Sequence, residues 1–322
     1  MKALITGITG FVGSHLTEHL LLQGHEVSGI ALSGDSAENL SHLRDRITLL
    51  EGDLLRPETL QAALSNVRPD WVFHLAALSS VASSWKNPAL AFELNVIGGI
   101  RLLEACIPFK DQLRVVLVTS AEIYGGGDTS GNLTEESPYS PRNPYAVTKL
   151  ALDLVAEQMT RASGLQLIRL RPMNHTGPRQ APGFVVPDFA KQIAEIEAGG
   201  REPVFKVGNL NSHRDFTDVR DIARAYTLAA ERGLSGEAYL ICTGKCRPIR
   251  EALETLLSFS EVSITVEQDP AKTRPVDSHV PSALPSKFTE TTGWRPEIPF
   301  EQTLRDTLEY WRTKVQRGSS RN

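Results

Sequence analysis

Residues 1–23 combine a short strand, a glycine turn and a helix, and this order constrains the fold more than any other part of the chain. Residues 2–6 are strand formers, glycines follow at positions 7, 10 and 13, and residues 14–23 place leucines at helical spacing. Such a turn lets backbone amides approach a pyrophosphate, whose negative charge the helix N-terminus meets. We therefore predict a dinucleotide site here, with a merely structural turn as the alternative. Its candidate contacts are Gly7, Thr9, Gly10, Phe11, Val12 and Gly13.

Further apolar runs alternate with helical patterns through the first half of the chain. The predicted strands cover 26–32, 47–54, 71–77, 114–119 and 165–171, and the long predicted helices cover 88–107 and 145–163. This alternation is typical of a parallel sheet with helices on both faces and ligands beyond the carboxyl ends of the strands. The fold class predicted is α/β, a Rossmann-like doubly wound parallel sheet.

The ends of these strands supply the other candidate cofactor contacts. The strand over 26–32 leads to Ser33, where an NAD-preferring fold usually carries an acidic residue for the ribose 2′-hydroxyl. The lack of that acid removes a repulsion against a 2′-phosphate, so NADP(H) is favoured. No arginine stands there to hold the phosphate, so NAD(H) stays possible. Asp53 is suited to an adenine amino group, and the remaining candidates are Leu54, Leu75, Ala76, Ala77 and Asn95.

A Tyr-x-x-x-Lys pair, Tyr145 and Lys149, opens the predicted helix over 145–163. The four-residue spacing puts both side chains on one helical face. There the ammonium of Lys149 would lower the pKa of Tyr145 towards working pH, where a phenol is most useful as a proton donor. By itself the pair is also compatible with a solvated helix face, and it is the glycine turn and Ser120 that favour catalysis.

Ser120 follows the strand over 114–119 and is placed to hydrogen-bond a substrate oxygen beside Tyr145. Its alternative role is a helix or turn cap. Glu122 is a carboxylate near the same site and is either a general base or a hydrogen-bond anchor. The loop over 125–142 is rich in Gly, Ser and Pro, and we expect it to lie over the mouth of the site.

The alternation of strand and helix patterns becomes less regular after residue 170. Helices are predicted over 187–198, 219–232, 249–259 and 300–316, and a charged loop over 268–277. We therefore predict a dinucleotide-binding domain over 1–170 and a smaller α/β substrate-binding domain over 171–316, some segments of which return to the first domain. Residues 317–322 are predicted to be a disordered tail.

Composition excludes several classes of function. The net charge of -4 and the lack of a basic run argue against nucleic acid, and no apolar run reaches the length of a membrane span. The three cysteines are too scattered for a disulfide framework, and Cys242 and Cys246 have no second ligand pair for zinc. The start of the chain lacks the pattern of a signal peptide. We expect a cytoplasmic protein that binds no metal.

The motifs together resemble the extended short-chain dehydrogenase/reductase superfamily, in its nucleotide-sugar branch. The resemblance rests on Gly7-x-x-Gly10-x-x-Gly13, Asp53-Leu54, Leu75-Ala-Ala77, Asn95, Ser120 and Tyr145-x-x-x-Lys149. Residues 171–178, 212–219 and 268–274 look like the members of that branch that act on GDP-sugars. Two features depart from the dehydratases among them: no Arg-Arg pair follows the second strand, and Ser120-Ala-Glu122 replaces Thr-Ser-Glu.

This resemblance implies an NADPH-dependent reductase that converts the C4 keto group of a GDP-bound 4-keto-6-deoxy sugar into GDP-D-rhamnose. Tyr145 would donate the proton, Ser120 would position the carbonyl oxygen, and Lys149 would also hold the nicotinamide ribose. The alternatives are a GDP-mannose 4,6-dehydratase or another nucleotide-sugar epimerase or dehydratase, and, less favoured, a non-catalytic dinucleotide sensor. The candidate substrate contacts besides Ser120 are Asn174, His175, Arg179, Val185, Lys191, Arg214, Arg274 and Asp277.

The two long helices of the first half predict a homodimer. Both carry more apolar residues than one face needs, so pairing them across a two-fold axis would form a four-helix bundle. The alternative is that these residues all face their own sheet. They are Leu90, Leu94, Leu102, Leu103, Leu150, Leu152, Leu154 and Val155.

Overall fold

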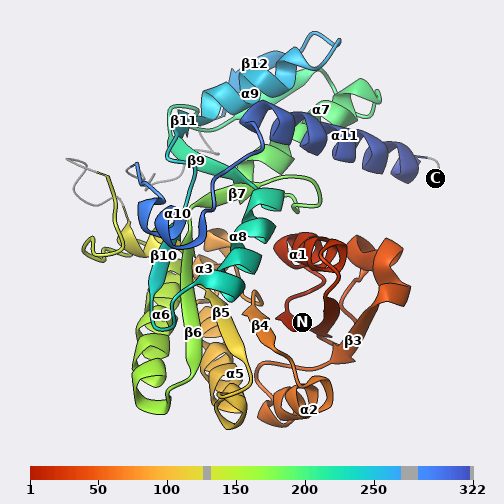
Figure 1. The fold of residues 1–322 in the computed structure, drawn as a ribbon. Coiled ribbons are helices and arrows are strands. Elements are labelled where there is room, and N and C mark those ends of the chain that lie inside the picture. The colour runs from red at the N-terminus through yellow and green to blue at the C-terminus, as the bar shows by residue number, and fades with distance from the viewer. Residues whose placement is uncertain (126–131, 270–281, 320–322) are drawn as a thin grey trace.

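The computed structural model describes residues 1–125, 132–269 and 282–319 and is built around one seven-stranded sheet (Figure 1). The strand order is β10-β6-β5-β4-β1-β2-β3, and every neighbouring pair is parallel. The strands are β1 (Lys2–Thr6), β2 (Glu26–Ala31), β3 (Ile47–Glu51), β4 (Trp71–His74), β5 (Arg114–Val118), β6 (Gln166–Pro172) and β10 (Ala238–Ile241). Because the order runs outward in both directions from β1 and β4, the sheet is doubly wound and its switch point lies between them. This confirms the predicted fold class.

Helices cover both faces of this sheet. One face packs against α1 (Phe11–Leu22), η1 (Glu38–Arg46), α8 (Val219–Arg232) and α10 (Ser286–Thr292). The other packs against α2 (Pro57–Val67), α5 (Gly98–Cys106) and α6 (Pro144–Ser163). The strands are therefore buried on both sides, which explains their nearly continuous apolar sequences.

A second lobe stands at the carboxyl ends of the strands, at the top of Figure 1. Its core is formed by α7 (Val185–Glu197), β8 (Val204–Val207), α9 (Ile249–Ser258) and α11 (Phe300–Ser319). A three-stranded sheet, β11-β9-β7, comprises β7 (Asn174–Thr176), β9 (His213–Asp218) and β11 (Cys246–Pro248), and β12 (Thr265–Gln268) pairs with β8. The half of the molecule built on the seven-stranded sheet also includes α8 and β10, although both follow residue 170 in the chain.

The predicted helix over 88–107 differs in the structure. It consists of α4 (Pro88–Phe92), a π-helical turn η2 (Glu93–Ile97) and α5, followed by the short η3 (Ile107–Phe109). Wider turns of this kind are frequent at functional sites, and this one contains Asn95. Two short helices not predicted from the sequence, α3 (Val81–Lys86) and η4 (Ala121–Tyr124), follow β4 and β5.

Two of the predicted boundaries are also corrected. The first helix begins at Phe11 rather than residue 14, so Gly13 lies in its first turn. A Cβ on Gly13 would lie 2.2 Å from the carbonyl oxygen of Gly7, which is why only glycine fits. Strand β4 ends at His74, and Leu75, Ala76 and Ala77 form the loop beyond it. Among the described residues, no helix is long and apolar enough to cross a membrane.

Candidate active site

The glycine turn lies at the switch point of the sheet. Gly7 has φ of +72°, and a Cβ there would be 2.9 Å from the backbone nitrogen of Ala76, so the turn lies directly against the loop after β4. Gly10 is the N-cap of α1, makes no side-chain capping bond, and no acidic residue follows in the first turn. The first amides of α1 are thus left for an external anion, which fits the pyrophosphate of a dinucleotide. Thr9, Phe11 and Val12 line this turn and are partly exposed.

Asn95 holds the loop after β4 instead of lying open to a cofactor. Its side chain is 1% exposed, its Oδ1 accepts from Leu78 N at 2.7 Å, and its Nδ2 donates to Leu78 O at 3.2 Å. The same Nδ2 donates to Thr148 Oγ1 on α6 at 2.9 Å. Asn95 therefore fixes the loop that carries Ala76 and Ala77 relative to the helix that carries Tyr145.

The adenosine end is formed after β2 and β3. Ser33 lies in the exposed turn after β2. The carboxylate of Asp53 accepts from Leu55 N at 2.8 Å and leaves its other oxygen for a ligand amine. Leu54 packs against the backbone of Gly98, where a Cβ would approach it to 2.9 Å.

The structure brings Ser120, Tyr145 and Lys149 together at the carboxyl end of β5. Ser120 lies near enough to Tyr145 to lower the pKa of its phenol, and the Ser120 hydroxyl accepts from Glu122 N at 3.1 Å as the N-cap of η4. Lys149 lies with its Nζ 5.9 Å from the centre of the Tyr145 ring and donates to Val118 O at 3.0 Å. The cap considered for Ser120 is therefore present, and its hydrogen bond to a substrate oxygen stays a prediction.

One expectation for this pair is wrong. Burial raises the pKa of Tyr145 to about 12; the Ser120 hydrogen bond opposes that rise and the nearby Glu122 adds to it. Burial also lowers the pKa of Lys149 to about 8. Loss of water around both groups thus outweighs any lowering of the Tyr145 pKa by Lys149. The proton of Tyr145 is held until a ligand changes the surroundings of the phenol.

Two further residues position the start of α6. Asn143 is its N-cap, accepting from Ala146 N at 2.8 Å, and its Nδ2 lies 3.4 Å from Glu122 Oε2. Ser84, on α3, accepts from Tyr145 N at 3.1 Å. The Asn-Pro start of a helix is a sequence signal that identifies Asn143 as a cap. Ser84 has no such signal, because its contact with Tyr145 exists only in three dimensions.

A buried charge network lies one helical turn beyond Lys149. Asp153 is fully buried and accepts from Arg171 Nη2 at 2.7 Å, from Arg169 Nη1 at 2.9 Å and from Thr119 Oγ1 at 2.9 Å. These hydrogen bonds keep the pKa of Asp153 below its usual value despite burial. The network joins α6, β5 and β6 next to Ser120, and the sequence analysis did not find it.

The candidate substrate residues divide into several groups. Asn174 and His175 lie on β7 beside β9, and the His175 ring stacks on Phe11 with centroids 6.1 Å apart, so His175 borders the cofactor turn. Val185 begins α7 and packs on the core of the second lobe. Lys191 pairs with Glu195 at 3.5 Å on that helix. Arg214 lies on β9 opposite Arg247 of β11. Arg274 and Asp277 lie outside the described residues.

Arg179 lies on the same side as His175. Its guanidinium pairs with Glu18 of α1, its Nη1 donating to Oε1 at 3.0 Å, and it also contacts His15 and the main chain of Asn39. Because the His15 ring packs on Phe11, which also contacts His175, Arg179 lies on the cofactor half of the molecule. Among the described residues no cluster of three or more metal-ligating side chains is found.

The parallel sheet, the glycine turn and the Ser120, Tyr145 and Lys149 cluster define an NAD(P)-dependent enzyme of the short-chain dehydrogenase/reductase type. The chain belongs to the GDP-mannose 4,6 dehydratase family, whose profile matches residues 4–307. This confirms the resemblance drawn from the motifs.

Individual relatives include both reductases and dehydratases. The chain is 32% identical to GDP-6-deoxy-D-mannose reductase of Pseudomonas aeruginosa, over 98% of both chains. It is 30% identical to GDP-mannose 4,6 dehydratase 1 of Arabidopsis thaliana, over 94% of this chain and 87% of that one.

The chain also matches solved structures of proteins in complex with NADPH or with NAD. The structure of RMD from Pseudomonas aeruginosa complexed with NADPH matches with a TM-score of 0.83 and 30% identity, covering 98% of this chain and 99% of that one. The UDP-glucose 4-epimerase of Thermus thermophilus in complex with NAD matches with a TM-score of 0.85 and 31% identity, covering 97% and 99%. The fold is thus shared with proteins whose solved structures hold either cofactor.

Proposed function

We propose that the protein uses NADPH to reduce the C4 keto group of GDP-4-keto-6-deoxy-mannose, also called GDP-6-deoxy-D-lyxo-4-hexulose, to GDP-D-rhamnose. The observation that carries this proposal is that Ser120, Tyr145 and Lys149 meet at the carboxyl end of β5, with Lys149 Nζ 5.9 Å from the centre of the Tyr145 ring. The similarity to a GDP-6-deoxy-D-mannose reductase over nearly the whole chain supports the substrate. The similarity to RMD complexed with NADPH supports the cofactor.

The residues of the chain would handle the oxygen of the ketone. The bound nicotinamide supplies a hydride to the carbonyl carbon. The Ser120 hydroxyl donates to the carbonyl oxygen, and Tyr145 gives its proton to that oxygen as negative charge develops. The added hydride and proton together convert the ketone into an alcohol. Lys149 would stabilise the phenolate left on Tyr145 and hold the nicotinamide ribose.

The nucleotide end of the substrate would lie toward the second lobe. Asn174 and His175 lie on β7, His175 borders the cofactor turn, and Arg214 lies on the neighbouring strand β9. We propose Asn174 for the sugar or first phosphate and Arg214 for the diphosphate, because arginine can hold phosphate oxygens bidentately. An alternative for Arg214 is pairing with carboxylates of the chain.

A 4,6-dehydratase is the second candidate, and the position of Glu122 favours it. Its charge acts on Tyr145, and its carboxylate is 3.4 Å from the Asn143 amide, so a general base is available beside the phenol. Incubation with GDP-mannose alone separates the two functions. We expect no reaction, whereas the 4-keto sugar with NADPH should be consumed together with NADPH. Formation of the 4-keto product from GDP-mannose without added nucleotide would overturn the reductase.

A non-catalytic dinucleotide sensor would bind NADPH without turnover. The Tyr145→Phe variant tests this alternative, because it removes the proton donor and keeps the ring in place. We expect it to lose kcat and to bind NADPH as the unchanged protein does. If the unchanged protein shows no turnover with any 4-keto nucleotide sugar, the sensor is favoured.

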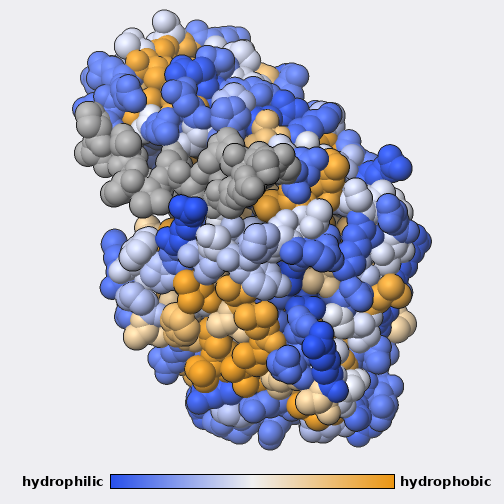
Figure 2. Space-filling model, turned by 90° about the vertical axis from the view of Figure 1, so that its left-hand side faces the viewer, coloured by the Kyte–Doolittle hydropathy of each residue, from blue (hydrophilic) through white to orange (hydrophobic). Residues whose placement is uncertain are grey.

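We also propose a homodimer. Exposed apolar side chains gather on α4, η2 and α6, and Figure 2 shows a hydrophobic area on the side where α6 lies in Figure 1. They are Leu90, Phe92, Ile97, Val147 and Leu154. Leu102, Leu103 and Leu152, which the sequence predicts at this interface, instead belong to the protein's own core. The exposed residues suffice to support pairing of these helices into a four-helix bundle.

The proposed reaction belongs in the cytoplasm. Cys106 and Cys242 are buried free thiols, which a reducing compartment preserves. Isolation of the native protein from an exported fraction would contradict this assignment.

A further inference from the structure

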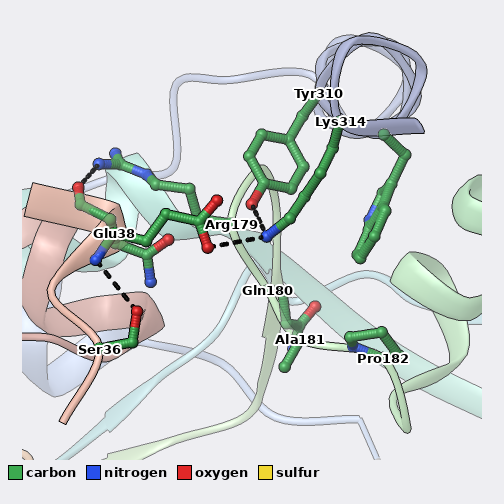
Figure 3. A pocket seen from close by; sticks show the side chains of 10 residues that line it. Ser36, Glu38, Arg179, Gln180, Ala181, Pro182, Tyr310 and Lys314 are labelled. Carbon is green, nitrogen blue, oxygen red and sulfur yellow. Dashed lines mark hydrogen bonds and ion pairs between the residues drawn. The ribbon is translucent and has the colours of Figure 1, made fainter. Parts of the chain in front are cut away.

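A pocket lies between the two lobes (Figure 3). Two of its residues, Ser36 and Asn39, follow β2 in the chain. It has a volume of about 230 Å³, which is several times the roughly 30 Å³ that one water occupies in the liquid. Its walls come from three distant parts of the chain: η1 with the turn before it, the loop after β7, and α11. The residues are Ser36, Glu38, Asn39, Arg179, Gln180, Ala181, Pro182, Tyr310, Trp311 and Lys314.

The η1 wall places this pocket beside the cofactor turn. Asn39 donates from Nδ2 to Thr9 O at 3.1 Å, so η1 lies against the loop that would hold the pyrophosphate. Ser36 follows β2 by a few residues, and the end of that strand is where a dinucleotide fold meets the adenosine ribose. The 2′ position of a bound cofactor would therefore face this pocket.

The charged side chains of the pocket suit a phosphate. Among the described residues, Lys314 Nζ has two long hydrogen bonds, each 3.4 Å, to Glu38 Oε2 and Tyr310 Oη, and an ammonium has three donors. The Glu38 pair is exposed, with side chains 41% and 70% accessible, so it stabilises little and can yield to a dianion. Glu38 would then turn into solvent.

Arg179 adds a guanidinium that its ion pair with Glu18 holds in place. Its side chain is 12% exposed and is locked by Glu18, while its Nη1 reaches Asn39 O at 3.4 Å on the pocket wall. Its backbone has φ of +73°, a conformation that is costly for a residue with a side chain and that clusters at ligand sites. The fold thus accepts local strain where this arginine enters the pocket.

Trp311 forms a rigid wall of the pocket. Its side chain is 5% exposed and belongs to the core of the second lobe. The Lys314 Nζ lies 5.9 Å from the centre of the Trp311 ring, so the indole helps to hold the ammonium at the pocket.

We propose that this pocket binds the 2′-phosphate of NADPH, with Lys314 as the direct cation, Arg179 as a guanidinium held by Glu18 and Ser36 as a hydroxyl partner. This inference rests on the NADPH dependence within the proposed function. The two cations replace the arginine that is lacking after β2, and both come from the second half of the chain. Discrimination between NADPH and NADH is therefore made between the lobes.

Titration calorimetry with 2′,5′-ADP and 5′-AMP tests this proposal without substrate or turnover. The two probes differ by the 2′-phosphate alone. We expect 2′,5′-ADP to bind at least tenfold more tightly, and Lys314→Met to remove most of that difference while leaving 5′-AMP binding unchanged. Arg179→Met should act in the same direction, and Glu38→Gln should strengthen 2′,5′-ADP binding because it removes a negative charge.

Arg305→Met is the matched control, because it removes a cation of α11 that pairs with Glu301 outside the pocket. It should leave both affinities unchanged. Equal binding of the two probes to the unchanged protein would overturn the proposal, as would a Lys314→Met variant that weakens both probes equally. Failure of the reductase function would show separately, as a lack of turnover with the 4-keto sugar and NADPH.

Discussion

At the scale of single residues, burial decides how the candidate catalytic groups behave. The phenol of Tyr145 and the amine of Lys149 are both removed from water, so each favours its neutral form. The sequence pair suggested an activated phenol, but that inference ignored desolvation. The neutral, hydrogen-bonded phenol suits a proton donor, which is what reduction of a ketone needs.

This predicts a specific pH dependence. Because the pKa of Lys149 is about 8, the free enzyme loses the ammonium as the pH rises through that value. The value of kcat/KM for NADPH reports the free enzyme, so we expect it to fall about tenfold per pH unit above that point. Tyr145, with a pKa of about 12, titrates too high to cause this. In Lys149→Met the rate should be low and this alkaline limb absent; an unchanged limb would contradict the assignment.

At the scale of elements, the catalytic helix α6 is fixed by charges as well as by its apolar face. Asp153 is buried between Arg169 and Arg171, and the same carboxylate accepts a hydrogen bond from Thr119, the residue before Ser120. Arg171 also donates to Tyr124 Oη at 2.6 Å and to Glu135 O at 2.9 Å. The network thus connects the helix of Tyr145 with the loop expected over the site.

We expect Asp153→Asn to lower the free energy of unfolding by about 3–5 kcal/mol, because it leaves two buried guanidinium groups facing an amide in place of a carboxylate. Urea unfolding measures this. Arg161→Met is the control, since it breaks the exposed pair between Arg161 and Glu157 on the same helix, 70% and 24% accessible. That change should cost less than about 1 kcal/mol. Similar losses in both variants would show that the network does not stabilise the fold.

At the scale of the whole molecule, the proposed dimer depends on the apolar side chains that α4, η2 and α6 leave exposed. If α4, η2 and α6 pair across a two-fold axis, light scattering at micromolar concentration should give twice the 35.3 kDa of one chain. Leu154→Glu puts a charge at the exposed apolar face, where Leu154 is 43% accessible, and should give the monomer mass.

Leu22→Glu is the control for this experiment. Leu22 is 82% accessible and ends α1, away from that face, so the variant should keep the dimer mass. A monomer mass for the unchanged protein would exclude the dimer.

Features that depend on neighbours along the chain can be predicted from the sequence. The strand, glycine turn and helix at Gly7–Gly13, the alternation that makes a parallel sheet, and the spacing of Tyr145 and Lys149 are local patterns, so they could be predicted. The order of the motifs was enough to indicate the family. The sequence could not show the π-helical turn at Asn95, because such a turn is stabilised by the loop and helix that it contacts.

Contacts between side chains that are distant in the sequence depend on the tertiary structure. Ser84 joins Tyr145 across 61 positions, and Arg179 joins Glu18 across 161. Lys314 reaches Glu38 across 276 positions, which places a cation beside the end of β2 where the local sequence has none. The sequence could not show which side chains are buried either. Burial raises the pKa of Tyr145, whereas the sequence pattern predicts a lowered one. The physical reason is the same in each case: packing sets distances and removes water, and both depend on the complete fold.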